Sequence, residues 1–229
     1  MPEFSVILPA AGSSRRFRGF AQKKPFVSLV DEPVWSRTVR AFTDRTDVVQ
    51  VLLVLADSER RHFIDQFGEC SDRMELVSGG DSRAESVCNA LQQVPASVEY
   101  VAVHDAARPL ISQPVIDRVF AAAVQSGAAI PGIPVTSTVK QIDSAGLIQS
   151  TIDRSQLILA QTPQAFGHQV LLDAYAKASG RLQDFTDEAS LVEATGHPVT
   201  VTEGSWDNIK VTTADDFQLL QTILKERSR

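Results

Sequence analysis

Residues 4–16 have the sequence FSVILPAAGSSRR, an apolar run that ends in small residues and arginines. The run at 4–9 predicts a strand that is buried on both faces, as in a parallel sheet. Four similar runs follow, at 48–56, 74–78, 100–104 and 128–134. Amphipathic segments that predict helices lie between and after them, at 34–43, 58–67, 82–94, 113–126, 169–179 and 214–225. This alternation predicts a three-layer α/β fold with a mainly parallel sheet.

Residues 134–160 break the alternation. Two runs of alternating polarity are separated by the sequence DSAG at 143–146, and Gly146 can take the positive φ that a tight turn needs. The pattern predicts a β-hairpin inserted into the fold, which either packs on its own subunit as a flap or reaches a partner chain. Since no repeat or linker interrupts the sequence, we expect one domain over residues 1–229 with a β-hairpin arm at about 134–160.

Charge and composition restrict the class of protein. The 229 residues carry 22 Lys and Arg against 28 Asp and Glu, and 43% are hydrophobic, which argues against a disordered chain and against a nucleic-acid binder. Residues 1–24 are nevertheless basic, with five Lys or Arg and one Glu, which favours a focused site for a small polyanion. No leader peptide or membrane-spanning run is visible, and two cysteines are too few for a disulfide framework. We therefore expect a cytoplasmic protein that does not bind membranes.

The loop after the first strand predicts an anion site, because open parallel sheets bind ligands at the carboxyl ends of their strands. Its small residues let backbone N–H groups approach an anion, and Ser13 and Ser14 add hydroxyl donors. Arg16 can make a forked contact with phosphate and Lys23 a compact one. Phe17 and Ser14 occupy positions that the P-loop and the dinucleotide fingerprint reserve for glycine, so both motifs are excluded. A solvated basic loop is the alternative interpretation.

The run at 100–104 ends in HDAARP, residues 104–109. A carboxylate at the end of a buried strand and beside a triphosphate can bind Mg²⁺, so Asp105 is a candidate metal ligand. Arg108 can contact substrate phosphate or hold the loop. A strand-end turn with an Asp–Arg pair explains the same residues equally well. We expect His104 to be a packed residue rather than a general base.

Two further polar motifs could complete such a site. In GGDSRAES, residues 79–86, the glycines permit close approach to a flat base, and Asp81 or Ser86 can read its edge. The alternative is a helix start capped by Asp81 or Ser82. In WDNIKVT, a strand-like run at 206–212, Asp207 can add a metal ligand and Lys210 can hold a phosphate, or the two form a surface ion pair. TDEAS, residues 186–190, predicts a capped helix start.

Taken together, these motifs resemble the 2-C-methyl-D-erythritol 4-phosphate cytidylyltransferase family over residues 4–224. The matching pieces occur in the family's order: PAAGSSRR, KK at 23–24, GGDSRAES, HDAARP, TSTVK, TIDRS, QTPQAF, TDEAS and DNIKVT. The resemblance implies a Rossmann-like nucleotidyltransferase fold and transfer of CMP from CTP to 2-C-methyl-D-erythritol 4-phosphate, with release of pyrophosphate. It also implies a homodimer in which each arm embraces the partner subunit.

The resemblance further implies roles for individual residues. Those that would hold CTP are Ala10, Ala11, Gly12, Ser13, Ser14, Gly80, Asp81, Arg83, Ser86 and Ala106. The cationic catalytic set would be Arg16, Lys23, Arg154 and Lys210, and methylerythritol phosphate would be positioned by Arg108, Thr138, Arg154 and Lys210. The ligands of Mg²⁺, or of another divalent cation, would be Asp105 and Asp207. The sequence departs from the family at Ser14, where many members have a second glycine.

The residue types suit this chemistry. A phosphate monoester has a second pKa of about 6, so near neutral pH it is already an anionic nucleophile and needs no base. Fixed cations and a metal are needed instead, to bring two polyanions together. A ribitol 5-phosphate cytidylyltransferase is the nearest alternative, although Ala107, Glu188 and Asp207 favour methylerythritol phosphate. A non-catalytic nucleotide-binding module is a second alternative. The presence of the full set Arg16, Lys23, Asp105, Arg154 and Lys210 argues against it.

Overall fold

The protein is described here by a computed structural model that covers residues 1–11, 26–68 and 73–227. Its strands are β1 (Phe4–Pro9), β2 (Ser28–Leu29), β3 (Glu32–Pro33), β4 (Val48–Leu55), β5 (Met74–Ser78), β6 (Tyr100–Val103), β7 (Ala128–Pro134), β8 (Val139–Ile142), β9 (Ile148–Ile152), β10 (Ile158–Ala160), β11 (Gln164–Gly167) and β12 (Thr200–Glu203). Its helices are α1 (Val34–Thr43), α2 (Asp57–Phe67), α3 (Arg83–Leu91), α4 (Gln113–Ser126), α5 (His168–Lys177), α6 (Glu188–Glu193) and α7 (Ala214–Arg227), with one 3₁₀ turn, η2 (Leu182–Asp184). Within the covered residues, no helix is long and apolar enough to cross a membrane.

Eight strands form the central sheet, in the order β10-β7-β11-β6-β1-β4-β5, with β12 beside β7. Strands β5, β4, β1 and β6 are parallel neighbours, which confirms the predicted mainly parallel α/β fold. The five strands expected from the sequence are all present, with ends that agree to within one residue. The sequence missed β11, which runs antiparallel between β6 and β7, because its four residues are too few to show a period.

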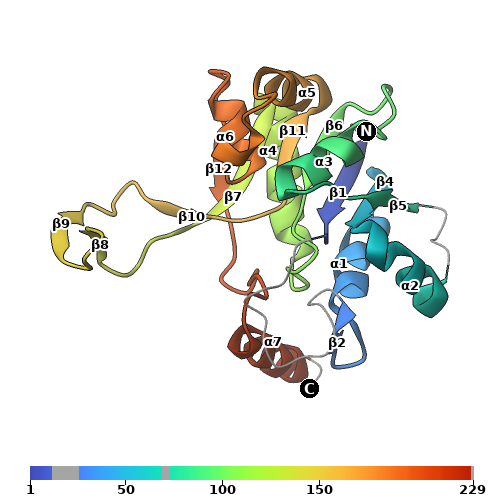
Figure 1. Cartoon of the computed structure of the whole chain (residues 1–229), viewed down its shortest axis with the longest axis horizontal. Helices are drawn as coiled ribbons and strands as arrows, with labels where there is room; N and C mark the ends of the chain where they lie inside the picture. Colours follow the sequence, from blue (N-terminus) through green and yellow to red (C-terminus); the bar gives the residue numbers. More distant parts are fainter. Residues whose placement is uncertain (12–25, 69–72, 228–229) are drawn as a thin grey trace.

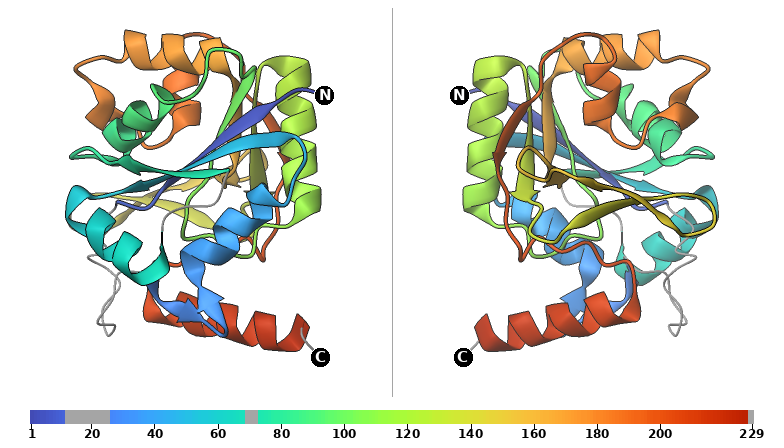
Figure 2. Two further views of the ribbon diagram at one scale, coloured as in Figure 1. Left: turned by 90° about the vertical axis from the view of Figure 1, so that its right-hand side faces the viewer. Right: turned by 90° about the vertical axis from the view of Figure 1, so that its left-hand side faces the viewer.

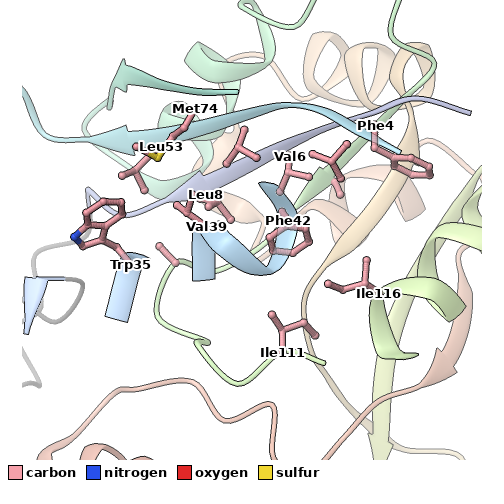
Figure 3. Packing of buried hydrophobic residues seen from close by; sticks show 14 of the residues in the cluster. Phe4, Val6, Leu8, Trp35, Val39, Phe42, Leu53, Met74, Ile111 and Ile116 are labelled. Carbon is pink, nitrogen blue, oxygen red and sulfur yellow. The ribbon is translucent and has the colours of Figure 1, made fainter. Parts of the chain in front are cut away.

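The sheet separates two apolar cores because side chains alternate along its strands. Phe4, Val6 and Leu8 of β1 belong to a core with α1, α2 and α4, whereas Ile7 belongs to a core with α3, α5 and α6. Figure 3 shows the first core, in which Trp35 of α1 packs against the sheet. Helices on both faces of the sheet confirm the three-layer arrangement.

Reciprocal caps start the two helices nearest the predicted site. The Ser82 hydroxyl accepts from the N–H of Glu85, and the Glu85 carboxylate accepts from the N–H of Ser82, so Ser82 rather than Asp81 caps α3. Asp187 and Ser190 form the same kind of pair at α6. The capped start predicted from TDEAS is therefore confirmed.

Helix α7 lies beyond the carboxyl end of β1. Its Phe217 and Leu220 join Leu29, Leu110 and Val211 in a third apolar cluster. Figure 1 and Figure 2 show α7, in red, lying apart from the two helical layers and next to β2. This packing leads the segment 204–213 past the HDAARP turn at the end of β6.

The prediction of a strand-like run at 206–212 is wrong. Strand β12 ends at Glu203, and the residues after it bond to the HDAARP turn instead of to a neighbouring strand. The N–H of Val211 donates to the carbonyl of Ala107 at 2.9 Å, and the carbonyl of Asn208 accepts from the Arg108 guanidinium at 2.7 Å. These two backbone groups are thus satisfied without a ladder.

Strands β8 and β9 form the predicted arm, a separate two-stranded sheet that projects away from the main sheet (Figure 1). A carboxylate oxygen of Asp143 accepts from the N–H groups of Ala145 and Leu147 at 2.9 Å each, and Gly146 has a φ of +81°, as its turn position predicts. Leu147 and Ile148 are 66% and 64% exposed. The arm therefore does not pack as a flap on its own subunit.

Candidate functional site

Ala11, which closely follows β1, lies against the glycine pair that precedes α3. A Cβ on Gly79 would lie 2.8 Å from the Cβ of Ala11 and 3.0 Å from Oγ of Ser86. Real Cβ atoms do not approach so closely, so any larger residue at position 79 would push these two elements apart. Gly79 was not among the predicted site residues, although the adjacent glycines were the available signal.

The start of α3 divides its predicted CTP residues into fixed and open groups. Ser86 is buried, and its hydroxyl accepts from the N–H of Gly80 at 3.1 Å and donates to the carbonyl of Ser82 at 2.8 Å. Gly80 and Asp81 are exposed. The glycine backbone and the Asp81 carboxylate are therefore the parts of this turn that a ligand can reach.

Asp105, at the end of β6, lies at the centre of a cationic cluster. It is 6% exposed. Its Oδ2 is 2.9 Å from Nζ of Lys210 and 3.2 Å from Nε of Arg108, and its Oδ1 is 3.6 Å from Nε of Arg83. Burial alone would raise the pKa of Asp105, but Lys210, Arg83 and Arg108 together hold that pKa well below its usual range. The site therefore carries an ionised carboxylate between three cations.

The three cations differ in their exposure and in the other groups that they already contact. Lys210 has a side chain that is 40% exposed. Arg108 has a side chain that is 13% exposed and also donates to the carbonyl of Asn208, so it holds two loops together. Arg83 donates from both Nη groups to the buried Glu188. Of these three groups, Lys210 is the one best placed to reach a substrate phosphate.

His104 is a structural residue, as the sequence predicts. Its ring is fully buried, with Nε2 3.2 Å from the carbonyl of Arg108 and Nδ1 3.0 Å from Oγ1 of Thr162. Because a carbonyl only accepts, the ring proton lies on Nε2, and Nδ1 accepts from the threonine hydroxyl. Burial lowers the pKa of His104 to about 4, so the ring is neutral near pH 7. It is not a general base facing the site.

A second set of residues holds the backbone of Asp105 in place through hydrogen bonds. The N–H of Asp105 donates to Oγ1 of Thr162 at 3.1 Å, and the carbonyl of Thr162 accepts from Nδ2 of Asn208 at 2.8 Å. The side chain of Gln161 also bonds to the backbone of Ser205. These residues were not predicted to belong to the site, although Gln161 and Thr162 are part of the motif QTPQAF. Their roles depend on contacts between loops that are distant in the chain, which a local sequence pattern does not predict.

The structure brings some predicted residues together and leaves others apart. Ala106 is buried, and its carbonyl accepts from the hydroxyl of Thr38 at 3.0 Å, so any contact that it makes with CTP is through the backbone. Thr138 and Arg154 are exposed on the arm, where Arg154 donates to the carbonyl of Thr136. Asp207 pairs with Arg227 of α7. The remaining predicted residues lie outside the described residues: Gly12, Ser13, Ser14, Arg16 and Lys23.

Fold and site together define a class of protein. A mainly parallel sheet is covered on both faces, and its carboxyl edge holds Ala11, a glycine pair and cations around one carboxylate. Open α/β sheets bind their ligands at this edge. The arrangement is that of a Rossmann-like nucleotidyltransferase.

Comparison with known proteins identifies the family. The family model described as 2-C-methyl-D-erythritol 4-phosphate cytidylyltransferase matches residues 4–226. Proteins of that name from Rhodopirellula baltica and Symbiobacterium thermophilum are both 41% identical to this chain, over 97% and 98% of its length and 95% and 94% of their own. The solved structure of that enzyme from Thermus thermophilus has a TM-score of 0.78 at 31% identity, covering 97% of this chain and 99% of that chain. The chain belongs to the 2-C-methyl-D-erythritol 4-phosphate cytidylyltransferase family.

Proposed function

We propose that this chain transfers CMP from CTP to 2-C-methyl-D-erythritol 4-phosphate and releases pyrophosphate, a step of non-mevalonate isoprenoid biosynthesis. Family membership supports the reaction. The observation that carries it is the ionised Asp105 held by Lys210, Arg108 and Arg83 at the carboxyl edge of the sheet. Such a centre stabilises negative charge and offers no base, which is what transfer between two phosphates requires.

In the proposed reaction, an oxygen of the substrate phosphate attacks the α-phosphorus of CTP. The bond between the α-phosphorus and the bridging oxygen breaks, and pyrophosphate leaves with that electron pair. No proton has to be removed, because the phosphate is already anionic, and the neutral, buried His104 agrees with this. Lys210 would neutralise charge on the reacting phosphates, and by family resemblance Arg16 and Lys23 would do the same from the first loop.

The donor set at Asp105 fits Mg²⁺. A carboxylate supplies the hard oxygen ligands that Mg²⁺ prefers, and Oδ1 lies 3.6 Å from Arg83, farther than a hydrogen bond. Among the described residues, no three His, Cys, Asp or Glu side chains form a metal-binding group, which suits an ion held by one or two carboxylates and substrate phosphates. Asp207 would be the second ligand after leaving Arg227. When bound, the ion would withdraw charge from the triphosphate.

The arm supports a homodimer as part of this proposal. Its apolar side chains at 142, 147 and 148 are 60%, 66% and 64% exposed, which is unfavourable unless a partner covers them. Thr138 and Arg154 flank the two strands of this arm, which projects away from the main sheet (Figure 1). In a homodimer they would position methylerythritol phosphate at the partner's nucleotide. We also propose a cytoplasmic location, which the free thiol of Cys88 suits.

A direct test measures pyrophosphate after mixing the purified chain with CTP, Mg²⁺ and one polyol phosphate at a time. Methylerythritol phosphate should give rapid release, and ribitol 5-phosphate should give little. Faster release with ribitol 5-phosphate would show that ribitol 5-phosphate, and not methylerythritol phosphate, is the acceptor. A folded protein that releases no pyrophosphate with either acceptor, yet binds CTP, would be the non-catalytic nucleotide-binding module.

A further inference from the structure

Glu188, the first residue of α6, makes a buried ion pair with Arg83, the first residue of α3. Glu188 is 0% exposed. Its two carboxylate oxygens accept from Nη1 and Nη2 of Arg83 at 2.7 and 2.9 Å. The Tyr175 hydroxyl of α5 donates to the same carboxylate at 3.2 Å. Helices α5 and α6 are thereby connected to the first residue of α3.

The ion pair also fixes the orientation of the Arg83 guanidinium relative to Asp105. With both Nη groups held by Glu188, Arg83 presents only its Nε edge to Asp105, at 3.6 Å. Without Glu188, the fork of Arg83 would be free to turn and make the bidentate contact with Asp105 that such pairs favour. That contact would occupy Oδ1, the oxygen of Asp105 that lies beyond hydrogen-bond distance of Arg83.

We propose that Glu188 is a positioning residue for nucleotidyl transfer, which holds Arg83 back so that Asp105 keeps a carboxylate oxygen for the metal–nucleotide complex. The inference rests on the proposed function. Charge supports the same inference. The cluster contains two carboxylates, Asp105 and Glu188, and three cations, Arg83, Arg108 and Lys210. Neutralising Glu188 therefore makes the cluster more positive by one charge, beside the place where a divalent cation would bind. Position and charge both predict weaker cation binding when Glu188 is changed.

The test compares Glu188→Gln with a matched control one residue away. Asp187→Asn makes the same acid-to-amide change on the same helix, but Asp187 contacts the N–H of Ser190 and the amide of Gln164 rather than Arg83. Three quantities are measured for each variant: kcat and KM for both substrates, thermal stability, and binding of Mn²⁺ with CTP followed by electron paramagnetic resonance. The last measurement needs no turnover, so it reports on the site even in an inactive variant.

For Glu188→Gln we expect kcat to fall and the Mn²⁺ dissociation constant to rise, each by about tenfold or more, with little change in KM for methylerythritol phosphate. Glu188→Asp, which keeps the charge, should recover part of both losses. Asp187→Asn keeps a residue that can cap α6 but removes a negative charge from the N-terminus of that helix, so it should lower the melting temperature slightly. Its kcat and Mn²⁺ binding should stay within about twofold of the unmodified chain.

A double variant keeps the inference testable if Glu188→Gln does not fold. Changing Arg83 and Glu188 both to Gln removes the buried charge pair as a unit, which costs less stability than leaving one charge alone. If Glu188 acts through Arg83, the double variant should be no less active than Arg83→Gln alone. Full additivity, or unchanged kcat and Mn²⁺ binding in Glu188→Gln, would overturn the inference. An unmodified chain that releases no pyrophosphate would instead overturn the proposed function.

Discussion

Replacing Asp105 by Asn is the change that tests the centre of the site most directly. The substitution keeps the shape of the side chain and removes the negative charge that Lys210, Arg108 and Arg83 surround. The negative charge stabilises the folded state, because the pKa of Asp105 is held below its ordinary value of 3.8. The carboxylate therefore stabilises the fold above about pH 4, and its contribution is lost as the pH falls further.

The size of the loss follows from the contacts. Asp105 accepts two charge-assisted hydrogen bonds, at 2.9 Å from Lys210 and 3.2 Å from Arg108, each worth about 1.5–3 kcal/mol, but the Lys210 bond is discounted because that side chain is 40% exposed. Arg83 keeps Glu188 and Arg108 keeps the carbonyl of Asn208, so neither is left without an acceptor. We therefore expect Asp105→Asn to lose about 3 kcal/mol of unfolding free energy at pH 7. Turnover should fall by about 10³-fold, because the carboxylate that holds Lys210 and Arg108 and that would bind Mg²⁺ is lost.

The assay combines urea unfolding at pH 7, followed by tryptophan fluorescence, with pyrophosphate release under conditions where the variant is folded. Asp47→Asn is the control, because Asp47 pairs with Arg45 at the start of β4, at the opposite end of that strand from the site. The control should lose about 1 kcal/mol of stability and keep its turnover. An Asp105→Asn protein that is as stable as the unmodified chain and turns over within tenfold of it would refute the reasoning.

Three further predictions concern the first loop, His104 and the arm. Lys23→Ala should lower kcat by roughly 10²-fold or more in a folded protein while Lys24→Ala lowers it far less, as steady-state kinetics would show, and equal effects would remove Lys23 from its role. His104 is neutral in the folded chain with a pKa of about 4, below the unfolded value of 6.5, so unfolding free energy should drop by about 3 kcal/mol as the pH falls from 6.5 to 4. Urea titrations of the unmodified chain and His104→Gln should differ in that slope, and parallel curves would contradict the assignment. Ile148 is 64% exposed on the arm, so Ile148→Glu should shift the mass in solution from dimer to monomer, as measured by light scattering. An unmodified chain that is monomeric at micromolar concentration would contradict a site shared between two subunits.

Much of the fold could be predicted because its signals are local. The apolar runs of β1 and β4 and the caps of α3 and α6 each depend on residues within one turn or one strand of one another. The same holds for the arm, whose turn is set by Asp143 and Gly146. Short elements such as β11, and the irregular segment at 206–212, were missed or mistaken because neighbours in space, not in sequence, satisfy their backbone.

The sequence alone determined the strand–helix alternation, the hairpin arm, the positions of the motifs and, through their order, the family. Only the tertiary structure decided which charges meet. Arg83 and Glu188 are 105 residues apart in the chain, and their pairing, together with the contact of Lys210 with Asp105, depends on how α6 and the segment before α7 pack against the sheet. Periodicity relates residues that are close along the chain, whereas electrostatic energy depends on the distance between atoms and on how much water separates them.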